Sequence, residues 1–235
     1  MQEFTSYDFV STFWFISIWL IYTLIADGIG AKKGNLIGTM RKHRLSWMKQ
    51  MMHRDNRLVD IQIINSLQLN TSFFASTSLL IVAGLITTLG ATEKAVKLLT
   101  DFPLTVEISK QMWEIKILSL IIIFIYAFFK FAWAMRQLNY CSILIGSVNR
   151  NDNLHNNDDK IAEEAANIAT KSGLHSNRGT RAYYYGLALL VWFIHPLLLI
   201  PTSIIIALVL FRREFKSQLL KSLSEINNLN KKQGG

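Results

Sequence analysis

Residues 113–140 are apolar over more than the roughly 20 residues that one bilayer-crossing helix needs. Polar and aromatic side chains recur within this stretch at spacings that place them on one stripe of a helix. We call this stripe the seam, and it consists of Lys116, Ser119, Tyr126, Lys130, Trp133, Gln137 and Tyr140. Because polar groups in a bilayer must meet protein or water, we expect the seam to face protein or a wet cavity.

The composition of the whole chain is that of a multi-span membrane protein. It has 235 residues, 51% of them hydrophobic, and its mean hydropathy is +0.26. We expect an all-α membrane protein with four transmembrane helices and long cytoplasmic helical extensions, in a single domain over residues 1–235. The expected spans are approximately residues 7–26, 69–91, 113–135 and 183–211. The first span follows an acidic leader without a cleavage site, so we expect an uncleaved anchor rather than a signal peptide.

Two long connections are expected to lie in the cytoplasm, a helical loop at residues 39–68 and a loop at residues 136–182. No Pro or Gly interrupts residues 40–83 or 111–145. We therefore expect span two to be prolonged as helix through Arg57 and Asp60, and span three to continue past Tyr140.

The distribution of charge predicts the orientation of the chain. The net charge is +9, but Lys and Arg concentrate in loops that flank the spans, which favours anionic lipid over nucleic acid as the partner. The first and third loops hold eight and six of these cations, whereas the N-terminus holds none and the second loop three. This count favours an outside N-terminus and places both long loops in the cytoplasm.

The C-terminus conflicts with this orientation, because four spans place it outside although it is also basic. Two interpretations stay open. In the first, residues 183–211 cross once as a tilted or kinked helix, which we favour for their length. Alternatively, Pro196 and Pro201 turn residues 183–211 into a re-entrant hairpin that returns the C-terminus to the cytoplasm.

Several charged and aromatic residues near the predicted membrane boundaries are candidates for ion pairs or for lipid contacts. Arg57 and Asp60 are three residues apart and can pair on a helix. The full set of ion-pair candidates is Asp27, Arg57, Asp60, Glu114, Arg136 and Glu214. Cations beside aromatic residues at a membrane entry are typical of an interfacial belt. The candidates for binding headgroups are Arg54, Arg178, Arg181 and Tyr184.

The sequence contains no recognisable catalytic constellation. Cys141 is the only cysteine, the five histidines are far apart, and no nucleophile motif or phosphate loop is present. We therefore expect no catalytic residue, no cofactor and no metal. A copper site of Met48, Met51, Met52 and His53 is the one metal alternative. A basic interfacial helix with methionines as apolar filler is the favoured interpretation.

Four blocks of residues carry a resemblance to a known family. They lie at residues 47–60, 66–90, 113–140 and 177–215, and they cover most of the chain after residue 46. With these residues the chain resembles the domain-of-unknown-function 599 family of bacterial membrane proteins. The resemblance implies an inner-membrane protein of four spans and supplies no activity. One departure is that the family's usual FNRGLR motif is SNRGTR here, at residues 176–181.

Two functions follow from these patterns. Lys116 and Lys130 are fourteen residues apart, about 21 Å along a helix, whereas the hydrocarbon core is about 30 Å thick. Both lysines therefore need a wet cavity, a partner or snorkelling, and a seam without carboxylates favours a homo-oligomeric pore or transporter for anions. The alternative is a non-catalytic accessory protein that binds anionic lipid headgroups or a membrane-protein partner.

Overall fold

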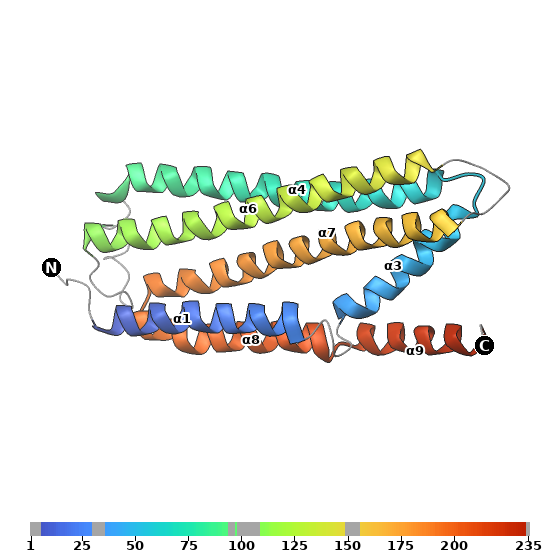
Figure 1. The fold of residues 1–235 in the computed structure, drawn as a ribbon. Coiled ribbons are helices and arrows are strands. Elements are labelled where there is room, and N and C mark those ends of the chain that lie inside the picture. Colours follow the sequence, from blue (N-terminus) through green and yellow to red (C-terminus); the bar gives the residue numbers. More distant parts are fainter. Residues whose placement is uncertain (1–5, 30–35, 94–96, 98–108, 149–155, 234–235) are drawn as a thin grey trace. The chain divides into compact units, whose positions relative to one another are not determined.

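The computed structural model describes residues 6–29, 36–93, 97, 109–148 and 156–233, and these residues form helices and short turns. The helices are α1 (Ser6–Leu24), α3 (Leu36–Met52), α4 (Leu58–Gly90), α6 (Lys110–Ser147), α7 (Asn156–Leu189), α8 (Leu199–Phe215) and α9 (Gln218–Gln233) (Figure 1). A π-helical turn, η1 (Ile25–Ile29), follows α1, and two 3₁₀ turns, η2 (Leu190–Phe193) and η3 (Pro196–Leu198), follow α7.

Four segments are long and apolar enough to cross a membrane. They are Ser6–Gly28, Leu58–Gly90, Lys110–Ser147 and Pro196–Leu223. This finding confirms the expected all-α fold with four candidate spans, although the fourth begins later along the chain than we expected. It identifies the molecule as a multi-pass membrane protein.

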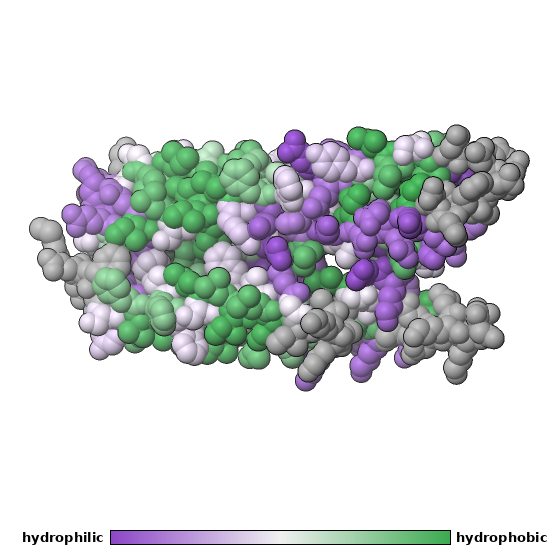
Figure 2. All heavy atoms as spheres, viewed as in Figure 1, coloured by the Kyte–Doolittle hydropathy of each residue, from purple (hydrophilic) through white to green (hydrophobic). Residues whose placement is uncertain are grey.

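The chain divides into two compact units. Unit 1 comprises Met1–Ile25, Ala75–Phe129 and Arg178–Leu210, and unit 2 comprises Ala26–Phe74, Lys130–Asn177 and Phe211–Gly235. By sequence, unit 1 holds six Lys and Arg residues and six Asp and Glu residues, so it is neutral. Unit 2 holds nineteen Lys and Arg residues and ten Asp and Glu residues. The whole net charge of +9 therefore belongs to unit 2. On the face drawn in Figure 2, most of the surface of unit 1 is apolar and unit 2 carries most of the hydrophilic residues.

Aromatic side chains hold three helices of unit 1 together. The Tyr185 ring of α7 stacks on Trp19 of α1 with centroids 5.3 Å apart, and it meets the edge of Phe15 at 5.7 Å. Trp19 in turn meets Tyr126 of α6 edge to face at 5.9 Å. Such pairs are stabilising beyond the area that they bury. Tyr126, a member of the seam, is thus turned toward protein.

The second half of α7 and the start of α8 form a helical hairpin within unit 1. Between them His195 adopts an extended backbone, with φ −156° and ψ 134°, because the proline that follows disfavours the helical region. The His195 Nδ1 then accepts a hydrogen bond from the Leu197 amide at 3.2 Å and starts the next turn. The α8 ribbon runs back against the direction of α7 (Figure 1). Residues 183–211, which we expected to cross once as a tilted or kinked helix, are divided between the end of α7, two 3₁₀ turns and α8.

The core of unit 2 lies where α3, α4, α6 and α7 meet. Its buried members are Met48, Met51, Ile64, Leu138, Cys141, Ile145, Ala162, Ala165, Ala166 and Ala169. The alanines of α7 permit a close approach of α6, and the Ser172 hydroxyl donates to the Ala134 carbonyl at 2.9 Å. Met48 and Met51 are fully buried in this core, whereas His53 is exposed. The two methionines thus pack as core residues of α3 and do not lie on a lipid surface.

Span two is prolonged as helix through Asp60, as expected, but Arg57 lies in the turn between α3 and α4 and not in the helix. The helix α3 ends at Met52, and α4 begins at Leu58. The Asn56 side chain accepts a hydrogen bond from the Leu58 amide at 2.9 Å, which caps the first turn of α4. Helix α6 does continue without a break to Ser147, as the absence of Pro and Gly predicts for residues 111–145.

Candidate functional site

Lys116, the first residue of the seam, is buried in unit 1 with only 3% of its surface exposed. Its Nζ donates a hydrogen bond to the Trp192 carbonyl at 2.8 Å and lies 5.2 Å from the centroid of the Trp192 ring. The indole Nε1 of Trp192 donates to Asp8 Oδ1 at 2.9 Å, and Asp8 is itself 4% exposed. We call these three residues the Trp192 cluster. A buried cation and a buried carboxylate are thus both bound to one tryptophan.

Sequence reasoning missed Asp8 as part of a site. The available signal was an acid near the start of the first apolar span, on the same expected side of the membrane as Lys116. Nothing in the sequence could show that Trp192, which is 184 residues away from Asp8, connects them.

The other seam residues have varied surroundings. Ser119 donates to the carbonyl of Ile115 in its own helix at 2.8 Å. In unit 2, Lys130 and Gln137 are half-buried, whereas Trp133 and Tyr140 are exposed. The Gln137 Oε1 is buried and accepts no hydrogen bond from any residue that the structure describes. The seam residues of unit 2 therefore do not share one buried surface.

Asp60 is fully buried in unit 2, and its partner is Arg54 rather than Arg57. Its Oδ1 accepts hydrogen bonds from Arg54 Nη1 at 2.6 Å and from Trp47 Nε1 at 2.7 Å. Its Oδ2 has no hydrogen-bond partner among the described residues. The break before α4 explains the difference, because Arg57 precedes the helix and the expected spacing no longer applies.

Arg57 instead binds the end of α6. Its Nη1 donates to the Val148 carbonyl at 2.7 Å and to the Ile145 carbonyl at 3.4 Å. A cation at this position satisfies terminal carbonyls and complements the helix dipole.

The remaining candidates are dispersed. Asp27, Glu114 and Glu214 are half-buried, in η1, at the start of α6 and near the end of α8. The guanidinium of Arg136 lies 6.0 Å from the ring of Trp133.

The arginines expected at the entry to the fourth span have different surroundings. Arg178 and Tyr184 are half-buried, but Arg181 is only 3% exposed and lies 5.9 Å from the Tyr22 ring within unit 1. Arg54, the fourth expected headgroup ligand, binds Asp60. The four headgroup candidates are thus divided between the units, with Arg54 in unit 2 and the other three in unit 1.

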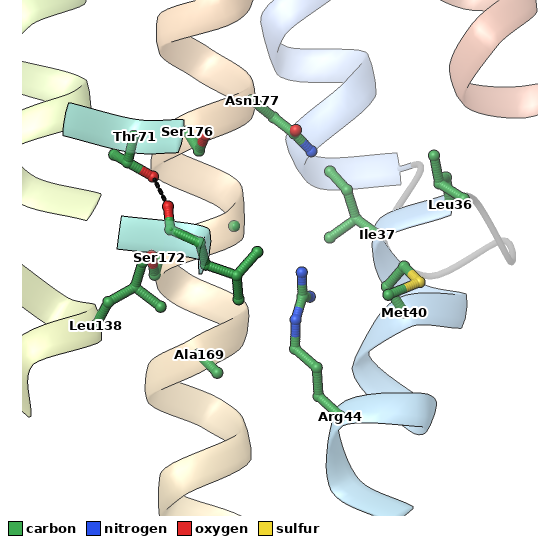
Figure 3. A pocket seen from close by; sticks show the side chains of 12 residues that line it. Leu36, Ile37, Met40, Arg44, Thr71, Leu138, Ala169, Ser172, Ser176 and Asn177 are labelled. Carbon is green, nitrogen blue, oxygen red and sulfur yellow. Dashed lines mark hydrogen bonds between the residues drawn. The ribbon is translucent and has the colours of Figure 1, made fainter. Parts of the chain in front are cut away.

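Unit 2 contains a cavity of about 220 Å³ that sequence reasoning did not identify (Figure 3). We call it the Arg44 cavity. It is lined by Leu36, Ile37, Met40, Arg44, Leu67, Thr71, Leu138, Ala169, Ser172, Gly173, Ser176 and Asn177. The Arg44 side chain extends from α3 into the space beside α7, toward Asn177.

Burial lowers the pKa of the Arg44 guanidinium below its ordinary value. The group nevertheless stays a cation, because arginine keeps its proton in proteins. The sequence offered Arg44 only as one of eight basic residues in the first loop. Its partnership with α7 depends on packing between segments that are about 130 residues apart, so no local pattern could have found it.

A second cavity of about 300 Å³ in unit 2 has a mixed charge. Its lining includes Asp27 together with Arg41 and Lys171. Arg41 Nη2 donates to Asn167 Oδ1 at 3.3 Å at the exposed edge of this cavity.

The four candidate spans and the basic unit define a multi-span α-helical membrane protein. The chain belongs to the family described as "Protein of unknown function, DUF599", whose model matches residues 10–219. The family thus agrees with the resemblance seen in the sequence and assigns no activity. No curated protein and no solved structure matches the chain.

Proposed function

We propose that the protein is a non-catalytic accessory protein of the bacterial inner membrane that binds anionic lipid headgroups through unit 2. The observation that carries this proposal is the segregation of charge, because unit 2 holds the entire net charge of +9 while unit 1 is neutral. Each cationic side chain near a membrane surface adds roughly 1 kcal/mol of attraction to anionic lipid.

The proposed orientation places the N-terminus outside and the loops and C-terminus of unit 2 in the cytoplasm. The chain starts in unit 1 and leaves it through α1, returns through α4 and leaves again through α6. The hairpin of α7 and α8 then enters and leaves unit 1 a last time, so the C-terminus belongs to the same unit as both long loops. All the strongly basic segments can therefore lie on one side, as the positive-inside rule requires.

The proposal is tested with the full-length protein in a neutral detergent. We expect phosphatidylglycerol to raise the thermal unfolding midpoint more than phosphatidylcholine does, because only the former carries a net negative charge. The difference should decrease as salt is added, since exposed charges are screened. Equal effects of the two lipids at low salt would contradict headgroup binding.

A homo-oligomeric, anion-favouring pore or transporter is the second candidate. Its support is Lys130, a half-buried cation in a run of phenylalanines that includes Phe129 and Phe131. The burial of Lys116 against the Trp192 carbonyl counts against it, because this end of the seam is occupied by protein. Chloride efflux from liposomes separates the two candidates. A pore requires efflux that Lys130→Met abolishes and Lys130→Arg partly keeps, whereas a headgroup-binding protein shows no efflux above that of empty liposomes.

A further inference from the structure

We propose that the Arg44 cavity is a binding site for a hydroxyl-bearing phosphate ester, presented either as a lipid headgroup or as a soluble ester. This inference rests on the proposed function, and it names the site and the chemistry of the ligand. Four properties of the cavity support it. They are an arginine without a partner among the described residues, a glycine that leaves room for its guanidinium, hydroxyl oxygens that can accept hydrogen bonds, and a suitable volume.

The cation is the first of these properties. Arg44 has no hydrogen-bond or ion-pair partner among the described residues, and the cavity lining contains no carboxylate. Such a guanidinium has lost part of its hydration, and no hydrogen bond within the described part of the protein compensates for that loss. A phosphate group supplies what is missing, because it accepts two parallel hydrogen bonds from the planar fork of an arginine.

Gly173 of α7, which has no Cβ atom, leaves the space that the Arg44 guanidinium occupies. A Cβ atom at Gly173 would lie 2.7 Å from Arg44 Nη2 and 3.3 Å from its Cζ, so a larger residue here would require the guanidinium to shift. Glycine in a helix interior costs about 1 kcal/mol relative to alanine. The site therefore uses a residue that the helix alone disfavours.

The oxygen atoms of the lining indicate that the ligand carries a hydroxyl group as well as a phosphate. The Thr71 hydroxyl donates to the Leu67 carbonyl at 2.7 Å (Figure 3). The Ser172 hydroxyl donates to the Ala134 carbonyl at 2.9 Å. With their protons used in this way, both oxygens can only accept hydrogen bonds from a ligand. They suit a hydroxyl donor beside the phosphate, as in a glycerol ester.

The volume of the cavity and the apolar residues that line it on α3 agree with a small headgroup. A volume of about 220 Å³ equals the liquid volume of roughly seven water molecules at about 30 Å³ each. It is smaller than the pockets of about 300–1,000 Å³ that hold drug-sized ligands. Leu36, Ile37 and Met40 of α3 form an apolar wall, which suits the carbon chain of an ester better than a free ion.

The experiment uses the full-length protein in neutral detergent with three probes, namely phosphatidylglycerol, phosphatidylcholine and soluble glycerol phosphate. Binding is measured for the wild type, Arg44→Gln, Gly173→Ala and the control Arg41→Gln. The control removes an exposed arginine from the same helix, whose partner is Asn167.

We expect Arg44→Gln to weaken binding of the preferred probe about tenfold or more, because it removes the charge-assisted hydrogen bonds. Gly173→Ala should weaken it comparably although it removes no polar group and favours the helix, since it displaces the guanidinium. Arg41→Gln should weaken binding by no more than about fivefold, the effect of removing one exposed cation from the general attraction to anionic lipid.

The probes distinguish the source of the ligand and also separate the two proposals. Binding of glycerol phosphate, with competition against the lipid, identifies a soluble ester, whereas binding of phosphatidylglycerol alone identifies a headgroup. If Arg44→Gln and Gly173→Ala both bind phosphatidylglycerol like the wild type, the Arg44 site is excluded while general headgroup binding stands. If the wild type binds none of the anionic probes, both proposals fall.

Discussion

Both units contain sheltered charges, but Arg44 of unit 2 differs from Lys116 and Asp8 of unit 1 in its partners. In unit 1, the buried Lys116 and Asp8 both form hydrogen bonds with Trp192. In unit 2, the guanidinium of Arg44 lines a cavity and has no partner among the described residues. A charge that is bound inside the fold stabilises one arrangement of helices, whereas a charge left without a partner is available to a ligand. Under the proposed function, unit 1 is the scaffold and unit 2 is the binding region.

Unit 2 also contains a buried charge that has partners within the protein, namely Asp60. Its carboxylate is fully buried and joins α4 to Arg54 and Trp47 across the break after α3. The comparison is thus between individual charges, and it depends on whether each has a partner within the protein. Four experiments can break or sharpen it.

The largest expected effect is an all-or-none difference between the two termini. We expect a reporter that is active only outside the inner membrane to be active at the N-terminus and silent at the C-terminus. The reason is that the α7–α8 hairpin returns the chain to unit 2, where the basic segments lie. Activity of the C-terminal fusion would contradict the proposed orientation, because it would place a basic segment of unit 2 outside the membrane.

Removing the buried carboxylate of unit 2 should have the next largest effect. We expect Asp60→Ala to reduce the free energy of unfolding by about 2–4 kcal/mol, because Trp47 and Arg54 both lose their acceptor. Arg54 is 40% exposed and can partly recover water, so the loss should lie below that of a fully buried pair. Unfolding in a titration with denaturing detergent measures it.

A double variant provides the control for Asp60. Asp60→Ala combined with Arg54→Gln should be less destabilised than the sum of the two single variants, because the charges act as a pair. Additive losses would show that the two residues are not coupled.

The Trp192 cluster of unit 1 should respond to the loss of a single N–H group. Trp192→Phe keeps an aromatic ring and the carbonyl that binds Lys116, but Asp8 loses the indole donor. We expect it to reduce the free energy of unfolding by about 1.5–3 kcal/mol, as for a hydrogen bond to a charged group.

Trp113 offers a matched control in the same unit. It is also buried, but its Nε1 has no hydrogen-bond partner among the described residues. Trp113→Phe should therefore cost less than Trp192→Phe in the same unfolding experiment. Equal losses would indicate that ring volume, and not the bond to Asp8, determines the stability of the cluster.

The smallest effect is expected for Arg44 in the absence of a ligand. Arg44→Gln should change the free energy of unfolding by no more than about 0.5 kcal/mol, because it breaks no hydrogen bond or ion pair that the described part of the chain forms. The same detergent titration, in lipid-free protein, measures it. A loss as large as that of Asp60→Ala would show that Arg44 stabilises the fold, and the contrast between the units would disappear.

The sequence by itself determined the helical membrane fold and the first three candidate spans, whereas the fourth begins later than the sequence predicted. The reason is that a bilayer acts on each helix separately, so an apolar run of sufficient length specifies a span without reference to any other segment. The same local logic predicted the unbroken helix α6, since no Pro or Gly lies between residues 111 and 145.

Only the tertiary structure decided which residues meet. Pro196 is compatible with a kink or a reversal, and the packing of unit 1 selects the hairpin. Asp60 binds Arg54 because α3 and α4 are separate helices, whereas a three-residue spacing favours Arg57 only on a continuous one. Likewise the contact between Arg44 and Gly173 joins two helices that are distant in sequence. Such contacts depend on the relative placement of helices, and the periodicity of each helix alone does not contain that information.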